Sequence, residues 1–245
     1  MSALPAYRVK VSARAKYARL QMSLREGLVV IVPRRFDQKR VPELLREKER
    51  WIERTAAKIA QQRKLLEAAP PDHLPERLAL CAIGEEWAVE YVPTDLPHVA
   101  AVEREACRLL VYGQTSDARA CKRVLRRWLS RKAQEHLVPW LHETAGERGF
   151  RFDHAVVKAQ RTRWASCSQS GTISLNLKLL FLPEALVRHV LIHELCHTVQ
   201  PNHSRHFWAL VGQHDPEFRQ ANRDLRAGWR HVPAWMESEK MLPEV

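Results

Sequence analysis

Long apolar runs are absent from this sequence of 245 residues. Its longest stretch without an acidic or basic residue is the 14-residue segment Trp164–Leu177, which is rich in serine. A membrane-spanning helix needs about 20 predominantly apolar residues, so no segment qualifies. The basic N-terminal stretch also lacks the apolar core of a secretory signal. We therefore expect a chain that neither crosses a membrane nor is secreted.

Glycine and cysteine are also scarce. The 8 glycines include no Gly-x-x-x-x-Gly-Lys motif, which argues against a phosphate-cradling P-loop. The five cysteines are scattered, odd in number and without a Cys-x-x-Cys pair. This pattern is typical of free thiols in a reducing compartment, rather than of a disulfide framework or a thiolate zinc site. A cytoplasmic location is therefore expected.

Acidic residues are outnumbered by basic ones, 28 against 40, which gives a net charge of +12. The excess is concentrated in residues 1–70, with 17 basic and 7 acidic residues, and in residues 114–132, with 7 and 1. A basic surface attracts phosphate backbones, so DNA is a candidate partner. The alternative is a solvated arginine-rich face, because no nucleic-acid-binding motif accompanies the charge. The candidate contacts to nucleic acid recur at helical spacing and are Arg123, Arg126, Arg127 and Arg131.

Strand-like segments dominate the first half of the chain. They are short, rich in β-favouring residues and punctuated by turn-forming ones. One helix is predicted over Val41–Ala69, ended by Pro70-Pro71, and Glu26-Gly27 is predicted as a turn. The predicted strands are Tyr7–Val11, Leu20–Leu24, Leu28–Pro33, Leu78–Ile83, Glu86–Val92, Val99–Val102 and Arg108–Tyr112.

Helices dominate the second half. Ser116-Asp117 is expected to cap a helix that reaches about Ala145, with a kink near Pro139. The pattern as a whole predicts an α+β fold. The chain is expected to divide into a strand-rich region 1–113 and a helix-rich region 114–245. The alternative is that it forms one continuous domain. The other predicted elements of the second half are strands at His154–Ala159 and Thr172–Asn176 and helices at residues 183–199, 204–212 and 216–226.

The residues that indicate a reactive site lie on the predicted helix 183–199, which carries His193-Glu194-Leu195-Cys196-His197. Histidines at positions i and i+4 point to one side of a helix, one turn apart, and can share one zinc ion. Glu194 lies beside the first histidine and can reach a water next to the metal without binding the metal itself. The surrounding positions are almost all apolar, so the helix is expected to be buried. Burying these polar side chains is costly unless a metal satisfies them.

A catalytic zinc site needs a third protein ligand and keeps its fourth position open. His203 is the preferred candidate, because it follows the helix stop Pro201-Asn202, where the chain can turn back under the ion. His206 is a rival, as a ligand or as a transition-state donor, and Arg163 is another candidate for the second role. The weaker alternatives for the third ligand are His214, His231 and Glu217.

Several motifs together resemble the YgjP-like zinc metallopeptidases. This family is related to the SprT-like proteins and to the wider gluzincin-type small metallopeptidases. The resemblance covers most of the chain, because the N-terminal strands and the Trp51-Ile52 helix also fit the pattern. The motifs that carry the resemblance are Arg163–Ser168, Gly171–Asn176, His193–His197 and Pro201–Ser204 with Phe207-Trp208.

The resemblance implies a small zincin-type catalytic half with a short β-sheet and one zinc ion. It also implies His193, His197 and His203 as zinc ligands and Glu194 as the catalytic acid/base. One residue departs from the family pattern, since Ala165 stands where glycine is usual. If that glycine provided a positive φ angle or a close backbone approach, alanine would be strained there. The zinc-binding helix itself is unaffected.

The predicted reaction is zinc-assisted hydrolysis of a peptide bond in a protein or peptide substrate. Glu194 takes a proton from the attacking water and delivers it to the leaving amine. Thr172–Asn176 is expected to pair with an extended substrate backbone, and the SprT-like relatives suggest substrates bound to nucleic acid. The alternative is a non-catalytic module with a structural zinc, whose basic face binds DNA or a protein partner. Three obvious ligands, rather than four, favour the enzyme.

Overall fold

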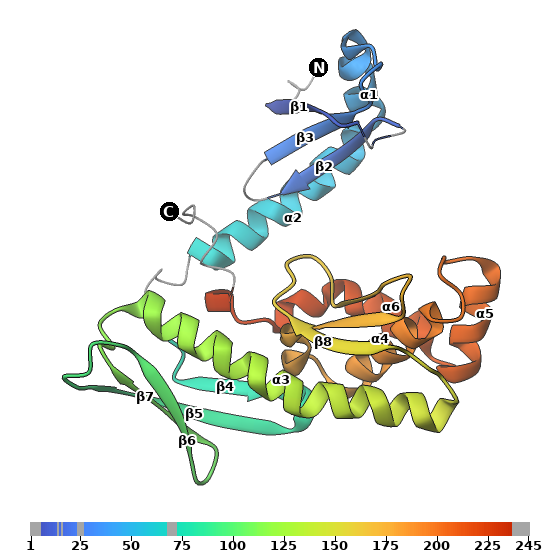
Figure 1. Ribbon diagram of the computed structural model, residues 1–245. Coiled ribbons are helices and arrows are strands. Elements are labelled where there is room, and N and C mark those ends of the chain that lie inside the picture. The colour runs from blue at the N-terminus through green and yellow to red at the C-terminus, as the bar shows by residue number, and fades with distance from the viewer. Residues whose placement is uncertain (1–5, 14, 16, 24–26, 68–72, 237–245) are drawn as a thin grey trace. The chain divides into compact units, whose positions relative to one another are not determined.

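The computed structural model describes residues 6–13, 15, 17–23, 27–67 and 73–236 (Figure 1). Its internal contacts divide the chain into two compact units, Met1–Pro71 and Asp72–Val245. The sequence placed the division near Gly113 instead. Residues 73–113 belong to the second unit because their strands share one core with the long helix that follows them. Glu26 of the predicted turn and the predicted helix stop at Pro70-Pro71 lie outside the described residues.

The first unit contains a three-stranded sheet and two helices. The central strand β3 (Gly27–Val32) pairs in parallel with β1 (Tyr7–Val11) and antiparallel with β2 (Arg19–Ser23). The predicted single helix is two, α1 (Val41–Glu47) and α2 (Glu49–Glu67), which meet at Lys48. A short 3-10 turn, Gln38–Arg40, precedes α1. The core of this unit is formed by buried residues of β3, α1 and α2, namely Leu28, Val30, Val32, Val41, Leu45 and Ile52.

The second unit begins with a four-stranded sheet of order β4-β5-β7-β6. Strands β5 and β7 are parallel, and the other two pairs are antiparallel. The predicted strand Leu78–Ile83 ends early, because Cys81–Ile83 forms a 3-10 turn that leads into Gly84 with φ +66°. Only glycine adopts this left-handed conformation without strain. The strands are β4 (Arg77–Leu80), β5 (Glu85–Pro93), β6 (Ala100–Arg104) and β7 (Arg108–Gly113).

The long helix α3 (Ala118–Arg148) follows the sheet. Asp117 caps its start as predicted, because the Asp117 side chain accepts a hydrogen bond from the backbone N–H of Ala120 at 2.9 Å. Gly149, with φ +71°, ends it. The helix continues through Pro139 as one element. Its buried face joins the first sheet to the rest of the second unit.

The second sheet has the order β8-β10-β9, with β8 (His154–Lys158) parallel and β9 (Ala165–Cys167) antiparallel to β10 (Thr172–Asn176). Strand β9 was not predicted. The prediction that Thr172–Asn176 pairs with a substrate is wrong, because β10 is the central strand and both of its edges are already paired. Strands β8 and β9 form the two edges of this sheet.

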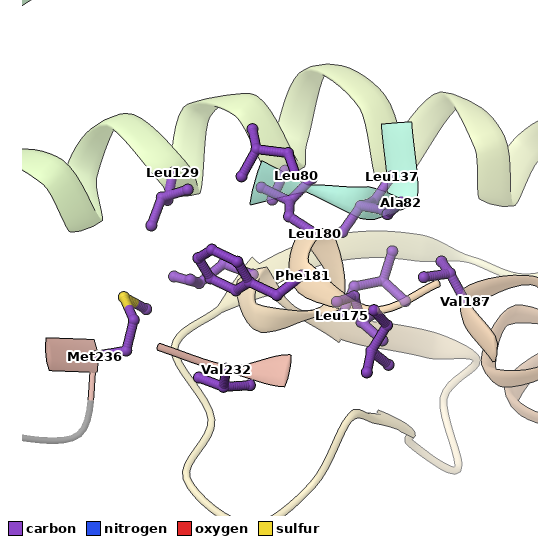
Figure 2. Packing of buried hydrophobic residues seen from close by; sticks show 14 of the residues in the cluster. Leu80, Ala82, Leu129, Leu137, Leu175, Leu180, Phe181, Val187, Val232 and Met236 are labelled. Carbon is purple, nitrogen blue, oxygen red and sulfur yellow. The ribbon is translucent and has the colours of Figure 1, made fainter. Parts of the chain in front are cut away.

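Three further helices follow the second sheet: α4 packs on α3 and on β9, and α5 and α6 pack on α4. Leu180 and Phe181 face Leu129 and Leu137 of α3 in the core (Figure 2). The α+β class predicted from the sequence is confirmed. No described helix is both long and apolar enough to span a membrane. The helices are α4 (Glu184–His197), α5 (Arg205–His214) and α6 (Phe218–Ala227), with 3-10 segments at Leu177–Phe181, Gly228–His231 and Ala234–Met236.

Candidate metal centre

Helix α4 carries the first two histidines of the candidate site. Pro183 precedes it as the N-cap and Glu184 lies in its first turn, where a negative charge is favoured by the helix dipole. Most of α4 is buried, as its apolar surroundings predicted. Its last turn brings His193 and His197 to one side, with ring centroids 4.9 Å apart.

The loop after α4 brings the third histidine, His203, close to His193 and His197. Asn202 accepts a hydrogen bond from the Ser204 backbone N–H at 3.2 Å, and Ser204 caps α5 by accepting one from Phe207 at 3.3 Å. These two bonds fix the turn that carries His203. One ligand atom from each of His193, His197 and His203 can be chosen so that all three lie within 4.8 Å of one another. Of the described residues, this is the one such group of three or more potential ligands.

The spacing of these nitrogens fits a tetrahedral cation. The Nε2 atoms of His193 and His203 are 3.1 Å apart. Two nitrogens that bind zinc tetrahedrally at about 2.0–2.1 Å lie about 3.3 Å from each other. Burial and the neighbouring imidazoles lower the pKa of His193 to about 3, so its ring is neutral at pH 7 and keeps the lone pair that a metal requires.

His197 is oriented by the backbone of the turn. Its Nδ1 lies 3.1 Å from the carbonyl oxygen of Gln200. A carbonyl can only accept, so Nδ1 donates the proton and Nε2 is left with its lone pair. A hydrogen bond of this kind fixes the tautomer and the ring orientation of metal-binding histidines. Burial lowers the pKa of His197, and this bond to Gln200 opposes the shift.

Phe207 forms the apolar floor of the cluster. Its fully buried ring stacks on His197, with centroids 4.4 Å apart, and meets His193 and His203 edge-on. Trp208 lies beside the rings of His193 and His203. The Phe207-Trp208 pair therefore restricts the imidazoles to the geometry described above.

Glu194 follows His193 in the chain, and its carboxylate is buried, with 7% of its surface exposed. Burial raises the pKa of Glu194 to about 7, while a hydrogen bond from the Cys167 backbone N–H and the positive charge of Arg163 oppose the shift. The hydrogen bond joins the sheet edge β9 to α4. A carboxyl group with a pKa near 7 is suited to accepting and releasing a proton at neutral pH.

The buried side chain of Asn176 organises the loop before β9. Its amide nitrogen donates to the carbonyl oxygens of Gln160 at 2.9 Å and Arg163 at 2.7 Å. Its amide oxygen accepts from the Lys178 backbone N–H at 3.1 Å. Through this loop, Asn176 positions the backbone of Arg163, whose charge acts on Glu194.

A family comparison agrees with this geometry. A family model described as YgjP-like, metallopeptidase domain, matches residues 16–228, which is most of the chain. The chain belongs to the YgjP-like family. Neither a curated protein nor a solved structure matches it significantly. The family resemblance predicted from the sequence motifs is therefore confirmed, and the family is one of metallopeptidases.

The other predicted ligands of this YgjP-like chain do not join the cluster. His206 is exposed on α5, and His214, at the end of α5, packs on Phe150 with ring centroids 4.6 Å apart. His231 lies at the end of a 3-10 segment and Glu217 is the exposed N-cap of α6. Arg163, by contrast, is close enough to lower the pKa of Glu194.

The departure at Ala165 from the usual YgjP-like glycine causes no backbone strain. Ala165 begins β9 and pairs with Leu175 of β10. It has no positive φ angle, because the described non-glycine residues with positive φ are Ala106 and Cys107 alone. The positive φ angle that would have strained an alanine is therefore absent at this position.

A buried pair next to the cluster was not identified from the sequence. His189 lies one turn before His193 on α4 with 2% of its surface exposed, and its Nδ1 is 2.5 Å from a carboxylate oxygen of Asp215. Asp215 is the C-cap of α5. The pair connects the helix that carries two histidines to the end of α5. No sequence motif marks it, because the two residues are distant in the chain.

Most of the arginines predicted to contact nucleic acid interact within the chain. Arg126 is the clearest case, because it is half-buried and its guanidinium donates to the Trp235 carbonyl oxygen at 3.1 Å. Arg127 is exposed on α3. The stripe is therefore a weaker candidate for binding phosphates than its spacing suggested. Arg131 forms ion pairs with Glu103 at 3.6 Å and Glu135 at 3.8 Å, and Arg123 forms one with Asp117 at 3.9 Å.

Proposed function

We propose that this protein is a zinc-dependent metallopeptidase that hydrolyses peptide bonds in protein or peptide substrates. His193, His197 and His203 would hold one zinc ion, and Glu194 would act as the general base. The observation that carries this proposal is the convergence of three imidazoles in a chain of the YgjP-like family, with the buried Glu194 next to His193 in the sequence.

The donor set supports a catalytic ion rather than a structural one. Structural zinc sites are closed by four protein ligands, whereas catalytic sites use three and leave a position for water or substrate. Of the described residues, no fourth histidine, cysteine or carboxylate joins the three imidazoles. This argues against the alternative of a non-catalytic, zinc-stabilised module. When bound, zinc supplies Lewis acidity that acidifies water and polarises a carbonyl group.

Glu194 would carry the proton through the reaction. Its carboxylate is adjacent in sequence to His193 and is kept from bulk water by burial. It would accept a proton as water attacks the scissile carbonyl and release it to the leaving amine. The Cys167 N–H would hold the carboxylate in place through both transfers, because it donates to Glu194 from the rigid edge of the sheet.

The substrate would lie near β9 rather than β10. Strand β9 is one of the two edge strands of its sheet and contacts α4 through Glu194. An extended peptide adds most readily to the edge of a sheet. The exposed Arg163 side chain is the nearest candidate for a contact to substrate, since its charge already reaches Glu194.

A Glu194→Gln variant tests the proposal. The purified chain would be loaded with zinc and incubated with a mixed peptide library, and cleavage would be read by mass spectrometry. The wild type should bind one zinc ion per chain and cleave peptides. Glu194→Gln should keep the zinc and lose cleavage by at least about 100-fold, as expected when a general base is removed.

The control is Glu217→Gln, which removes an exposed carboxylate outside the cluster and should leave both zinc and cleavage unchanged. Equal cleavage by Glu194→Gln and the wild type would contradict the role of Glu194. One bound zinc ion per wild-type chain with no cleavage of the library would favour the non-catalytic module.

A further inference from the structure

The first unit contains an open groove that the metal centre does not use. Helix α2 packs along strand β2 (Figure 1), and the groove between β2 and the two helices has a volume of about 530 Å³. Apolar side chains from the β2 side and from the helices both line the groove. The lining residues from β2 and its approach are Ala18, Arg19 and Leu20, and those from the helices are Leu44, Glu47, Lys48, Arg50, Trp51 and Arg54.

The groove is strongly basic. Four of its lining side chains are cationic and one is acidic. None of the four cations forms an ion pair with a residue that the structure describes. Toward the described residues Arg54 uses only its Nε, which donates to the Arg50 carbonyl oxygen at 3.0 Å, so its two terminal nitrogens keep their donors there. The arginines of α3 differ, since Arg126 and Arg131 already have partners within the chain.

Trp51 places an aromatic ring among these charges. Trp51 and Arg54 are three residues apart on α2 and therefore share one face, and Leu44 and Lys48 line the same groove. The adjacent Ile52 fills the core position and is 4% exposed, whereas Trp51 flanks the core and is 37% exposed. A ligand that matches this surface combines repeated negative charge with flat apolar rings. Unpaired nucleotides have both features, while an acidic peptide supplies only the charge.

We propose that this groove binds single-stranded nucleic acid. Arg19, Lys48, Arg50 and Arg54 bind backbone phosphates, and a base stacks on Trp51. Positively charged grooves with aromatic platforms are the usual means of binding single strands without sequence preference. Duplexes bind less well, because their base faces are buried in the stack. This inference does not rest on the proposed peptidase activity, since the groove lies in a separate unit and binding is measured without turnover.

The test is fluorescence anisotropy of a labelled 15-mer of deoxythymidine with the full-length chain at several salt concentrations. The triple variant Lys48→Gln/Arg50→Gln/Arg54→Gln should lower the slope of log affinity against log salt by about 2, because each single-strand phosphate contact contributes about 0.7. Trp51→Leu should weaken binding about tenfold at every salt concentration, and Trp51→Phe should restore most of that loss.

The matched control is Arg119→Gln/Arg151→Gln/Arg219→Gln, which removes the same charge from exposed positions of the second unit. It should retain the wild-type salt slope. Circular dichroism verifies that each variant is folded. Equal losses in the two triple variants, or competition by polyglutamate as effective as that by an unlabelled 15-mer, would overturn the proposal in favour of unspecific anion binding. No binding at 50 mM salt, or tighter binding of the duplex, would also overturn it.

Discussion

The Nε2 atoms of His193 and His203 lie 3.1 Å apart, although the two residues are ten positions apart in the chain. At this distance the Nε2 of one ring can donate a hydrogen bond to the Nε2 of the other. A cation that binds both lone pairs replaces that bond and attracts both rings. The short distance between these two nitrogens therefore supports a metal ion that both histidines bind.

Replacing His203 should remove most of the affinity for zinc. His203→Ala deletes one of three converging imidazoles, and we expect zinc affinity to fall by at least about 100-fold, since even changes to residues behind the ligands cost about 10–100-fold. Competition with a chromophoric chelator measures the affinity. His206→Ala is the control, because His206 is exposed and outside the cluster. A similar loss of affinity in both variants would show that His203 is not a ligand.

Replacing Asn176 should destabilise the second unit. Asn176→Leu leaves the carbonyl oxygens of Gln160 and Arg163 without their buried donor, and we expect the free energy of unfolding to fall by about 2–4 kcal/mol. Urea denaturation measures the change. Gln169→Leu, which alters an exposed amide between β9 and β10, should change stability by less than about 0.5 kcal/mol. A stable Asn176→Leu variant would contradict the positioning role of this amide.

The His189–Asp215 pair should stabilise the packing of α4 against the end of α5. Asp215→Asn removes a charge-assisted hydrogen bond to a buried ring, and we expect a loss of about 1–3 kcal/mol in the free energy of unfolding. Asp224→Asn is the control, because Asp224 is exposed on α6 and bonded there to Gln220. If both variants unfold at the same urea concentration as the wild type, the pair contributes nothing to stability.

Glu103 should make the stability of the second unit dependent on pH. Burial opposes its ionisation, but a hydrogen bond from Trp128 at 2.8 Å and the charges of Lys132 and Arg131 outweigh burial and lower the pKa of Glu103. A lowered native pKa stabilises the fold above the unfolded pKa of about 4.5, and this contribution is lost as the pH falls through the native value.

We therefore expect Glu103→Gln to be less stable than the wild type by about 1 kcal/mol at pH 7, since this partly exposed carboxylate is screened by water. The difference should shrink as the pH falls below about 4. Thermal unfolding of both proteins between pH 7 and pH 3 measures it. A difference that is constant with pH would contradict the assignment of this interaction to the ionised carboxylate.

The positions of the three clustered histidines were predictable from the sequence because the information is local. Helical spacing alone places His193 and His197 on one side of α4, and Pro201-Asn202 marks the turn that returns His203. The strand Thr172–Asn176 and the cap at Asp117 also follow from short-range patterns, and the structure has both at the predicted residues.

Features that depend on long-range pairing were not predictable. The edge strand β9 spans three residues, too few for a recognisable alternation, and its place beside α4 depends on the antiparallel pairing of Ala165–Cys167 with β10. Arg126 matches the exposed arginines in spacing, yet it binds the carbonyl oxygen of Trp235, which lies more than one hundred positions along the chain. Nothing in the spacing of α3 distinguishes an arginine that binds within the chain from one that faces solvent.

The most direct test of the metal-centre account is X-ray absorption spectroscopy at the zinc edge on the purified, zinc-loaded chain. The account predicts three imidazole nitrogens and one further oxygen at about 2.0–2.1 Å, with the imidazole signal reduced by one ring in His203→Ala. A sulfur neighbour at about 2.3 Å, or a spectrum unchanged by His203→Ala, would contradict it.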